Sequence, residues 1–350
     1  MSSVSPSFFG AVNYTLPDAI FELTKTYNAD PVAHKVNLGQ GTYKDGNGIL
    51  GFCPLASIIS DTGYGLDLWQ KFCCSPGRSS ALHIVGTMLK EALGRDTTVY
   101  ITKPSWSNHR KVFESIGFSV REFNYSSSAG VDMQSLIQTL DEAAPKSIFV
   151  FHASAHNPSG WDCRADQWKQ IGAIVKERQL FPLFDAAYLG LTSGDYDHDA
   201  MGLYGMNMIM VLFFVRHVLT RVEFSSLARM IRVEISNPPA FGARVVVAIL
   251  EDEELYAQWR KDLVMMSSRI AEMGRELYQG LTELGTPGDW KRIIEQKGMF
   301  CILGLTPNHV QHLQKEYHIY MAESSRVSIA GINGSNVRYV AECINETLKR

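Results

Sequence analysis

Several features are missing from this 350-residue sequence, and each absence disfavours a class of protein. The six cysteines form no CxxC pair and none lies at zinc-ligand spacing from histidines, so we expect free thiols in a reducing compartment and no metal site. The 33 basic and 36 acidic residues give a formal net charge of −3 without blocks of one sign, which predicts no nucleic-acid partner. The longest strongly apolar run, residues 208–215, is far shorter than the ~20 residues that span a bilayer, which predicts no membrane insertion.

Two further absences concern targeting and nucleotides. The first residues, MSSVSPSFFGAVNYT, contain no basic segment followed by an apolar one and are not rich in arginine. We therefore expect a cytoplasmic protein, with a mitochondrial location still open. No GxGxxG motif follows a strand-like run, which disfavours a nucleotide-dependent oxidoreductase, the general alternative for an α/β protein.

Strand-like and helix-like segments alternate in the first two thirds of the chain. Short apolar runs rich in Val, Ile and Phe predict strands at residues 98–102, 147–152, 180–185 and 208–215. Helical periodicity predicts helices at residues 81–94 and 164–179. Alternation of this kind predicts parallel strands joined by right-handed crossovers, and hence an α/β domain.

The pattern changes after residue 250. Apolar residues recur every three or four positions over 252–284, which predicts one long amphipathic helix. Strands at 299–305, 318–322 and 326–332 and a closing helix at 337–348 then predict a smaller α+β domain. We therefore divide the chain into an N-terminal arm with part of the small domain (1–48), a large domain (49–250), a long interdomain helix (251–285) and a small C-terminal domain (286–350).

Polar groups follow three of the predicted strands. Asp185 ends one strand, the loop HASAHNPSG (152–160) follows a second, and Trp106 follows a third. The carboxyl ends of parallel strands meet at one edge of the sheet, where α/β proteins bind ligands. Each residue alone has a simpler explanation, since Asp185 could cap a helix or form an ion pair, Trp106 could fill the core, and HNPSG could be only a turn.

Taken together, these motifs resemble the class I pyridoxal-phosphate-dependent aminotransferases, and within them the aspartate aminotransferases. The similarity runs nearly from end to end and includes VNLGQGTYKDGNG (36–48), KPSWSNH (103–109), HASAHNPSGWD (152–162), FDAAYLGLTSGD (184–195), ISNPPAFGAR (235–244), KGMFCILGL (297–305) and ESSRVSIAGI (323–332). The resemblance implies fold type I, with a mostly parallel sheet in the large domain and a smaller α+β domain. It also implies transamination between L-aspartate and 2-oxoglutarate with pyridoxal 5'-phosphate as the cofactor.

The resemblance implies a cofactor role for five residues. Asp185 would face the pyridine nitrogen and keep it protonated, so that the ring can act as an electron sink. Asn157 and Tyr188 would hydrogen-bond the phenolic oxygen of the ring, and Trp106 would stack on the ring face. Ser79, in GRSSALH (77–83), would hold the phosphate at a helix N-terminus.

The substrate would be a dicarboxylic amino acid or its 2-oxo acid. Arg326 would bind the α-carboxylate in a bidentate fork, and Arg232 would reach the distal carboxylate from the other subunit, which implies a homodimer. Gly41 would let the backbone approach the substrate, while Trp106 and Asn157 would contact it too. Phe300 would line the pocket and His156 would lie behind the ring, whereas His152 is interpreted as a buried histidine with satisfied hydrogen bonds.

One residue that the family requires is missing. In the family a lysine forms the Schiff base with the cofactor and moves the proton during transamination, and it precedes a GLYGER-like turn. Here DHDA (197–200) joins MGLYG (201–205) directly, and residues 177–260 contain no lysine. Asn207 replaces a phosphate-binding arginine, Phe52 replaces a phosphate-binding tyrosine, and the phosphate turn reads Gly77-Arg78-Ser79-Ser80. We therefore expect weaker, non-covalent binding of the cofactor and no catalytic lysine.

Two explanations for the missing segments stay open. The chain is either an inactive relative that keeps the scaffold for dimerisation and ligand binding, or an incomplete gene model in which coding segments were skipped. Clean joins between well-matched stretches favour the second explanation.

Overall fold

The central element of the fold is a sheet of five parallel strands. The computed structural model describes residues 17–41, 43, 78–94, 96–127, 129–204, 210–211, 221–237 and 240–350. Within this part of the chain the strand order is β3-β2-β6-β7-β8, and each neighbouring pair is parallel. The strands are β2 (Thr98–Lys103), β3 (Ser119–Asn124), β6 (Ile148–His152), β7 (Phe181–Asp185) and β8 (Met210–Val211).

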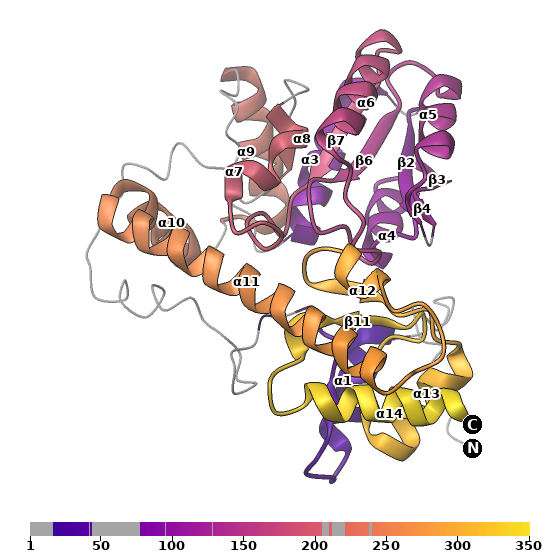
Figure 1. Ribbon diagram of the computed structural model, residues 1–350. Helices are drawn as coiled ribbons and strands as arrows, with labels where there is room; N and C mark the ends of the chain where they lie inside the picture. The colour runs from indigo at the N-terminus through magenta and orange to yellow at the C-terminus, as the bar shows by residue number, and fades with distance from the viewer. Residues whose placement is uncertain are drawn as a thin grey trace, which may run out of the picture.

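Helices cover both faces of this sheet (Figure 1). Successive residues of β6 point to opposite faces, so Phe149 and Phe151 belong to one apolar core while Ile148 and Val150 belong to another. The first core also takes in α5 (Met133–Glu142) and α6 (Ala165–Glu177), and the second takes in α3 (Arg78–Leu93) and α4 (Ser107–Ser115). Burial on both faces explains why these strands are continuous apolar runs.

The predicted α/β architecture is confirmed, but only part of the fourth predicted strand lies within the described residues. Of the strand expected at 208–215, the structure describes only β8, where Met210 pairs with Phe184 and Val211 with Asp185. The other elements of this half of the molecule are β4 (Ser126–Ser127), β5 (Gly130–Val131), α7 (Tyr196–Asp199), α8 (Met201–Tyr204), α9 (Arg221–Ile235) and α10 (Ala240–Glu251).

A single long helix, α11 (Glu253–Glu283), leads from this half to the second (Figure 1). Its N-terminus is capped by Asp252, whose carboxylate accepts hydrogen bonds from the backbone N–H groups of Glu254 and Leu255. Its C-terminal half is packed into a separate apolar core with α12 (Arg292–Glu295), α13 (Pro307–Tyr317), α14 (Val337–Lys349), β9 (Phe300–Ile302), β10 (Ile319–Tyr320) and β11 (Arg326–Ser328). No helix in the described ranges is long and apolar enough to cross a membrane.

The N-terminal segment joins this second half. After α1 (Ala19–Ala29), strand β1 (Val36–Asn37) pairs in parallel with β10. Asp30 anchors the segment, because its carboxylate lies 2.6 Å from the Tyr320 hydroxyl and 2.7 Å from Nδ1 of His318. The hydrogen bond from Tyr320 is the largest of the effects that lower the pKa of Asp30 to about 2.

The expectation of a strand over 326–332 is wrong at its C-terminal end. Strand β11 stops at Ser328, and Ile329–Gly331 form a 3-10 helix. The chain passes close to the N-terminal segment here, since a Cβ at Gly331 would lie 2.7 Å from the carbonyl oxygen of Asn37. Apolar periodicity could not distinguish a strand from this tight turn, because a buried turn has an equally apolar sequence.

Candidate functional site

The carboxyl ends of β6 and β7 place two side chains next to each other in the sheet. His152 pairs with Asp185 across these strands, and Asp185 is buried. Asp185 Oδ2 lies 2.9 Å from Nε2 of His109, whose Nδ1 lies 2.8 Å from the hydroxyl of Ser105. Asp185 thus has a partner within the chain that we did not predict. His109 follows Trp106 by three residues in α4, a spacing that places both on one helix face.

The loop after β6 holds Asn157 in a network of buried groups. The backbone N–H of Asn157 donates to Nδ1 of His152 at 3.1 Å. The ring of His156 lies 3.0 Å from the Thr102 hydroxyl and stacks on Tyr125 with ring centroids 4.1 Å apart. Burial lowers the pKa of His156 to about 3, so this ring is neutral and acts as a fixed packing and hydrogen-bonding group.

Arg326 brings a buried positive charge to Asn157. Its Nη1 donates to Oδ1 of Asn157 at 3.3 Å, its Nη2 donates to the carbonyl of Gly39 at 2.6 Å, and its guanidinium lies 4.8 Å from the ring centroid of Phe300. No carboxylate of the described ranges forms an ion pair with it. Burial is the main cause that lowers the pKa of Arg326, and the charges of Tyr188 and Asp18 oppose it only in part. Such an arginine is suited to bind an anionic ligand.

The wall beside Arg326 is closely packed. A Cβ at Gly41 would lie 2.4 Å from the Phe300 ring, so only glycine fits at that position without displacement. Tyr188 packs edge-on against the same ring, with centroids 5.6 Å apart. The two halves of the molecule meet here, since the backbone N–H of Lys297 donates to the carbonyl of Gly160 at 2.7 Å.

The remaining predicted residues lie at the borders of this cluster or away from it. Ser79 is in the first turn of α3, and Trp106 is the N-cap residue of α4, with its ring centroid 5.4 Å from that of His109. Arg232 is exposed on α9, where its guanidinium donates to the Ser236 hydroxyl, and none of its contacts involves the cluster. Phe52, Gly77 and Asn207 lie outside the described residues.

The clustered residues suit a pyridine-type cofactor and a carboxylate. A buried carboxylate at a sheet edge can hold a protonated ring nitrogen, and an amide with a phenol can hold a ring oxygen. The buried guanidinium of Arg326, which forms no ion pair in the described ranges, supplies the anion site, and Ser79 lies at a helix N-terminus, where a phosphate is favoured. The groups that fit are therefore those for the ring, the α-carboxylate and one part of the phosphate.

Known proteins with similar sequences are aminotransferases. The sequence profile described as "Aminotransferase class I and II" matches residues 55–218 and 200–344. The chain is 33% identical to the aspartate aminotransferase, cytoplasmic, of Saccharomyces cerevisiae, over 99% of this chain and 98% of that protein. That alignment extends over 411 positions against 350 residues here, so the yeast protein contains segments without a counterpart in this chain.

Solved structures give the same result. The cytoplasmic aspartate aminotransferase of Saccharomyces cerevisiae superposes with a TM-score of 0.89 at 32% identity, covering 98% of each chain. An aromatic-amino-acid aminotransferase of Burkholderia pseudomallei, covalently bound to pyridoxal phosphate, superposes with a TM-score of 0.88 at 29% identity, covering 98% of this chain and all of the other. These superpositions confirm the expected fold type I architecture.

Proposed function

Because the chain belongs to the class I and II aminotransferase family, we propose that it carries an aspartate aminotransferase-type site for pyridoxal 5'-phosphate and a dicarboxylic amino acid or 2-oxo acid. The observation that carries this proposal is the buried guanidinium of Arg326, which contacts Asn157 and forms no ion pair with a carboxylate in the described part of the chain. A carboxylate ligand would supply the missing charge.

Within this proposal each residue has a physical task. Asp185, oriented by His109, holds the proton on the ring nitrogen of the bound cofactor. Asn157 and Tyr188 hold its ring oxygen, Trp106 covers its face, and Ser79 contacts its phosphate. When bound, the cofactor supplies an electron sink for the amino acid carbon. Arg326 fixes the α-carboxylate, and Gly41 leaves room beside the Phe300 ring.

We also propose that this chain holds the cofactor without a covalent bond and does not catalyse transamination. The absence of lysine from residues 177–260 supports this, because the family's lysine belongs between Tyr188 and the GLYG turn. Two further observations agree with a lost segment there. The family profile matches in two stretches that overlap at residues 200–218, and the yeast relative contains segments with no counterpart here.

The experiment is addition of pyridoxal phosphate followed by borohydride, with peptide mass spectrometry. We expect a shift in cofactor absorbance on binding, no reduced lysine adduct at a single site, and no oxaloacetate formed from aspartate and 2-oxoglutarate. A single stable lysine adduct would disprove the non-covalent site. Absence of any cofactor or 2-oxoglutarate binding would disprove the proposed site itself.

A second candidate is that the gene encodes an active aspartate aminotransferase of which this sequence is an incomplete version. The continuous similarity on both sides of residues 195–205 favours it. Sequencing of the transcript across codons 195–205 and 45–55 tests it, because an added segment with a lysine before GLYG would restore the catalytic group. A transcript that matches the present sequence would leave the non-catalytic protein as the product.

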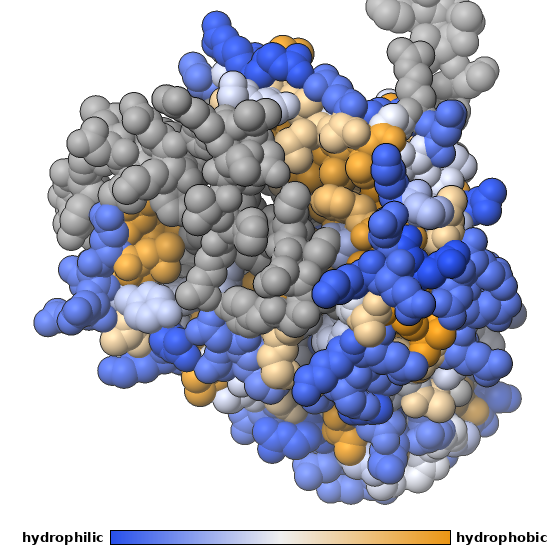
Figure 2. Space-filling model, turned by 90° about the horizontal axis from the view of Figure 1, so that it is seen from above, coloured by the Kyte–Doolittle hydropathy of each residue, from blue (hydrophilic) through white to orange (hydrophobic). Residues whose placement is uncertain are grey.

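We propose a cytoplasmic homodimer as the working form, by analogy with the family. Figure 2 shows apolar surface beside largely polar surface on one face of the molecule. Large apolar side chains are exposed on α9, α10 and α11, namely Val233, Phe241, Leu250, Val264 and Met265. Arg232 lies on α9 as well, so pairing through these helices would bring it towards a partner. Light scattering should show a dimer for the wild type and a larger fraction of monomer for Phe241→Asp. Cell fractionation tests the compartment.

A further inference from the structure

Two aspartates that the proposed function does not use hold the loops on which it depends. The loop after β6 presents Asn157, and Asp162 closes it. Asp162 Oδ2 accepts a hydrogen bond from the backbone N–H of Ala155 at 2.8 Å, and Oδ1 accepts one from the N–H of His156 at 2.9 Å. Both donors immediately precede Asn157, so the carboxylate sets the direction in which the chain enters that residue.

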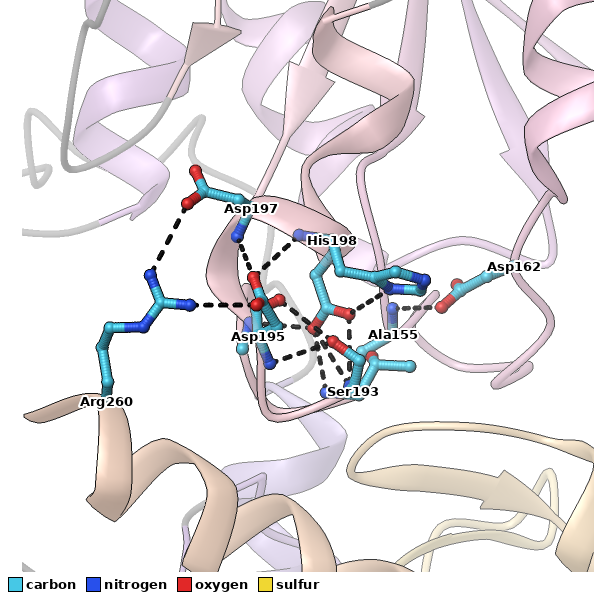
Figure 3. A network of polar contacts seen from close by, with 10 residues as sticks. Ala155, Asp162, Ser193, Asp195, Asp197, His198 and Arg260 are labelled. Atoms are coloured by element: carbon cyan, nitrogen blue, oxygen red, sulfur yellow. Dashed lines mark hydrogen bonds and ion pairs between the residues drawn. The ribbon is translucent and has the colours of Figure 1, made fainter.

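Asp199 makes the equivalent contacts to the loop after β7, which presents Tyr188. Figure 3 shows Ser193 of this loop near Ala155 and Asp162 of the first loop. The carboxylate of Asp199 is buried and accepts hydrogen bonds from three backbone N–H groups, those of Gly190 at 2.8 Å, Thr192 at 3.0 Å and Ser193 at 3.2 Å. Asp199 itself lies at the end of the short helix α7, so it folds the chain back onto the turn that follows Tyr188.

Neither loop has regular secondary structure to fix it. Ala155 has a φ of +50°, which is uncommon for a residue with a side chain, and Gly190 has a φ of +85°. Backbone N–H groups in such turns lack strand or helix partners and need other acceptors when buried. A carboxylate with two oxygens can satisfy two or three of them at once, more strongly than a neutral acceptor.

We propose that Asp162 and Asp199 are positioning residues of the site, one fixing the loop that presents Asn157 and the other fixing the loop that presents Tyr188. The proposal rests on the proposed function, in which Asn157 and Tyr188 hold the ring oxygen of the cofactor. Burial raises the pKa of Asp162 and the negative charge of Asp199 adds to that rise, so the two carboxylates lie near each other. The ring oxygen of the cofactor is thus held by two loops, each with its own carboxylate.

The test compares Asp162→Ala and Asp199→Ala with wild type and with Asp166→Ala. Asp166 is a matched control, because it is exposed, lies four residues after Asp162 and forms its ion pair with the exposed Arg164. Amide hydrogen exchange is measured first, without cofactor. We expect faster exchange at Ala155 and His156 in Asp162→Ala, and at Gly190, Thr192 and Ser193 in Asp199→Ala, with no change in the control.

Pyridoxal phosphate affinity and absorbance are measured next. Each Ala variant should weaken the affinity about ten-fold, the factor expected for losing hydrogen bonds to a charged group, and should shift the absorbance band of the bound ring. Asp162→Asn and Asp199→Asn keep one acceptor oxygen and should give intermediate values. If an Ala variant does not fold, the corresponding Asn variant is compared with wild type in its place.

The outcomes separate the two proposals. If wild type binds no pyridoxal phosphate, the proposed function is wrong. Loss of amide protection in the variants would still support the role of Asp162 and Asp199 in fixing the two loops. If amide exchange is unchanged in the variants, the positioning role is wrong whatever the affinity. If protection is lost but affinity and absorbance stay at wild-type values, the loops do not position groups for the cofactor, and the inference is overturned.

Discussion

At the scale of single residues, Arg326 gives the sharpest prediction. Arg326→Lys keeps a positive charge but loses the planar fork that contacts Asn157 and Gly39. We expect the affinity for 2-oxoglutarate to fall by at least about ten-fold, because a hydrogen bond to a charged group contributes about 1.5–3 kcal/mol. Titration calorimetry measures it. The control is Arg338→Lys on α14, which is exposed and pairs with Glu342; equal affinities in both variants would contradict the assignment.

A second residue-scale prediction concerns pH. Burial is the main cause that raises the pKa of Asp162 from 3.8 to about 6, and the charge of Asp199 adds to it, while the backbone N–H groups of His156 and Ala155 and the charge of Lys297 oppose it. The folded chain therefore binds this proton more tightly than the unfolded chain. The contribution of Asp162 to the free energy of unfolding is full below pH 3.8 and is lost as the pH rises to about 6.

Urea unfolding from pH 4 to 7 measures this contribution. Asp162→Asn should remove the fall in stability over that range, relative to wild type. Asp166→Asn is the control, because the hydrogen bond from Arg164 lowers the pKa of Asp166, so its contribution is lost only below about pH 4 and this variant should follow the wild-type profile from pH 4 to 7. The same pH profile in wild type and Asp162→Asn would show that Asp162 does not titrate in this way.

The sequence located some of these residues and missed others for physical reasons. Asp185 stands out because an apolar run ends at a charge, and such a charge needs a partner. His109 was missed because a polar residue in a short helix has no distinguishing pattern until the helix is placed against β7. The contact between Arg326 and Asn157 joins residues 169 positions apart. Only the family resemblance linked them, since local patterns contain no information on distant contacts.

At the scale of secondary-structure elements, Gly194 tests the contact between the loop after β7 and α11. It has a φ of +81°, and an added Cβ would lie 2.7 Å from the Ser267 hydroxyl and 3.0 Å from the Cα of Val264. We expect Gly194→Ala to lower the free energy of unfolding by more than the ~1 kcal/mol that a positive φ alone costs. Gly285→Ala separates the two effects, because Gly285 has a φ of +61° with open space around it.

Denaturant unfolding of both variants makes the comparison. Equal losses for Gly194→Ala and Gly285→Ala would mean that the close approach to α11 has no energetic effect. A larger loss of unfolding free energy in Gly194→Ala would show that the backbone of α11 cannot move away from the loop after β7. We expect this because Arg260 on α11 pairs with Asp195 at 2.9 Å.

Elements with strong periodicity were predicted closely, and short ones were not. The long helix expected at 252–284 is α11 at 253–283, because its apolar stripe and capping Asp252 both mark it. The strands of the small half are only two or three residues long, although apolar runs of five to seven residues predicted them. Their ends are set by pairing with distant partners, such as β1 with β10, rather than by local sequence.

At the scale of the whole molecule, the site is divided between the parallel sheet and a second apolar core, which the long helix α11 connects. Asn157 and Asp185 come from the sheet, whereas Arg326 and Phe300 come from the core around the C-terminal half of α11. Leu277 lies on α11 and is fully buried in that second core. Leu277→Ala should lower the stability of this half by about 2–5 kcal/mol.

Region-resolved hydrogen exchange measures where the stability is lost. Protection should fall across residues 300–344 and stay near wild type across residues 98–185, because the cores of the sheet contain no residue of α11. Binding of 2-oxoglutarate should weaken as well, since Arg326 is held by the weakened half. Gln279→Ala, an exposed change on the same helix, should leave both unchanged. A uniform loss of protection over both regions would mean that the two cores unfold as one unit, so that α11 couples them fully instead of only connecting them.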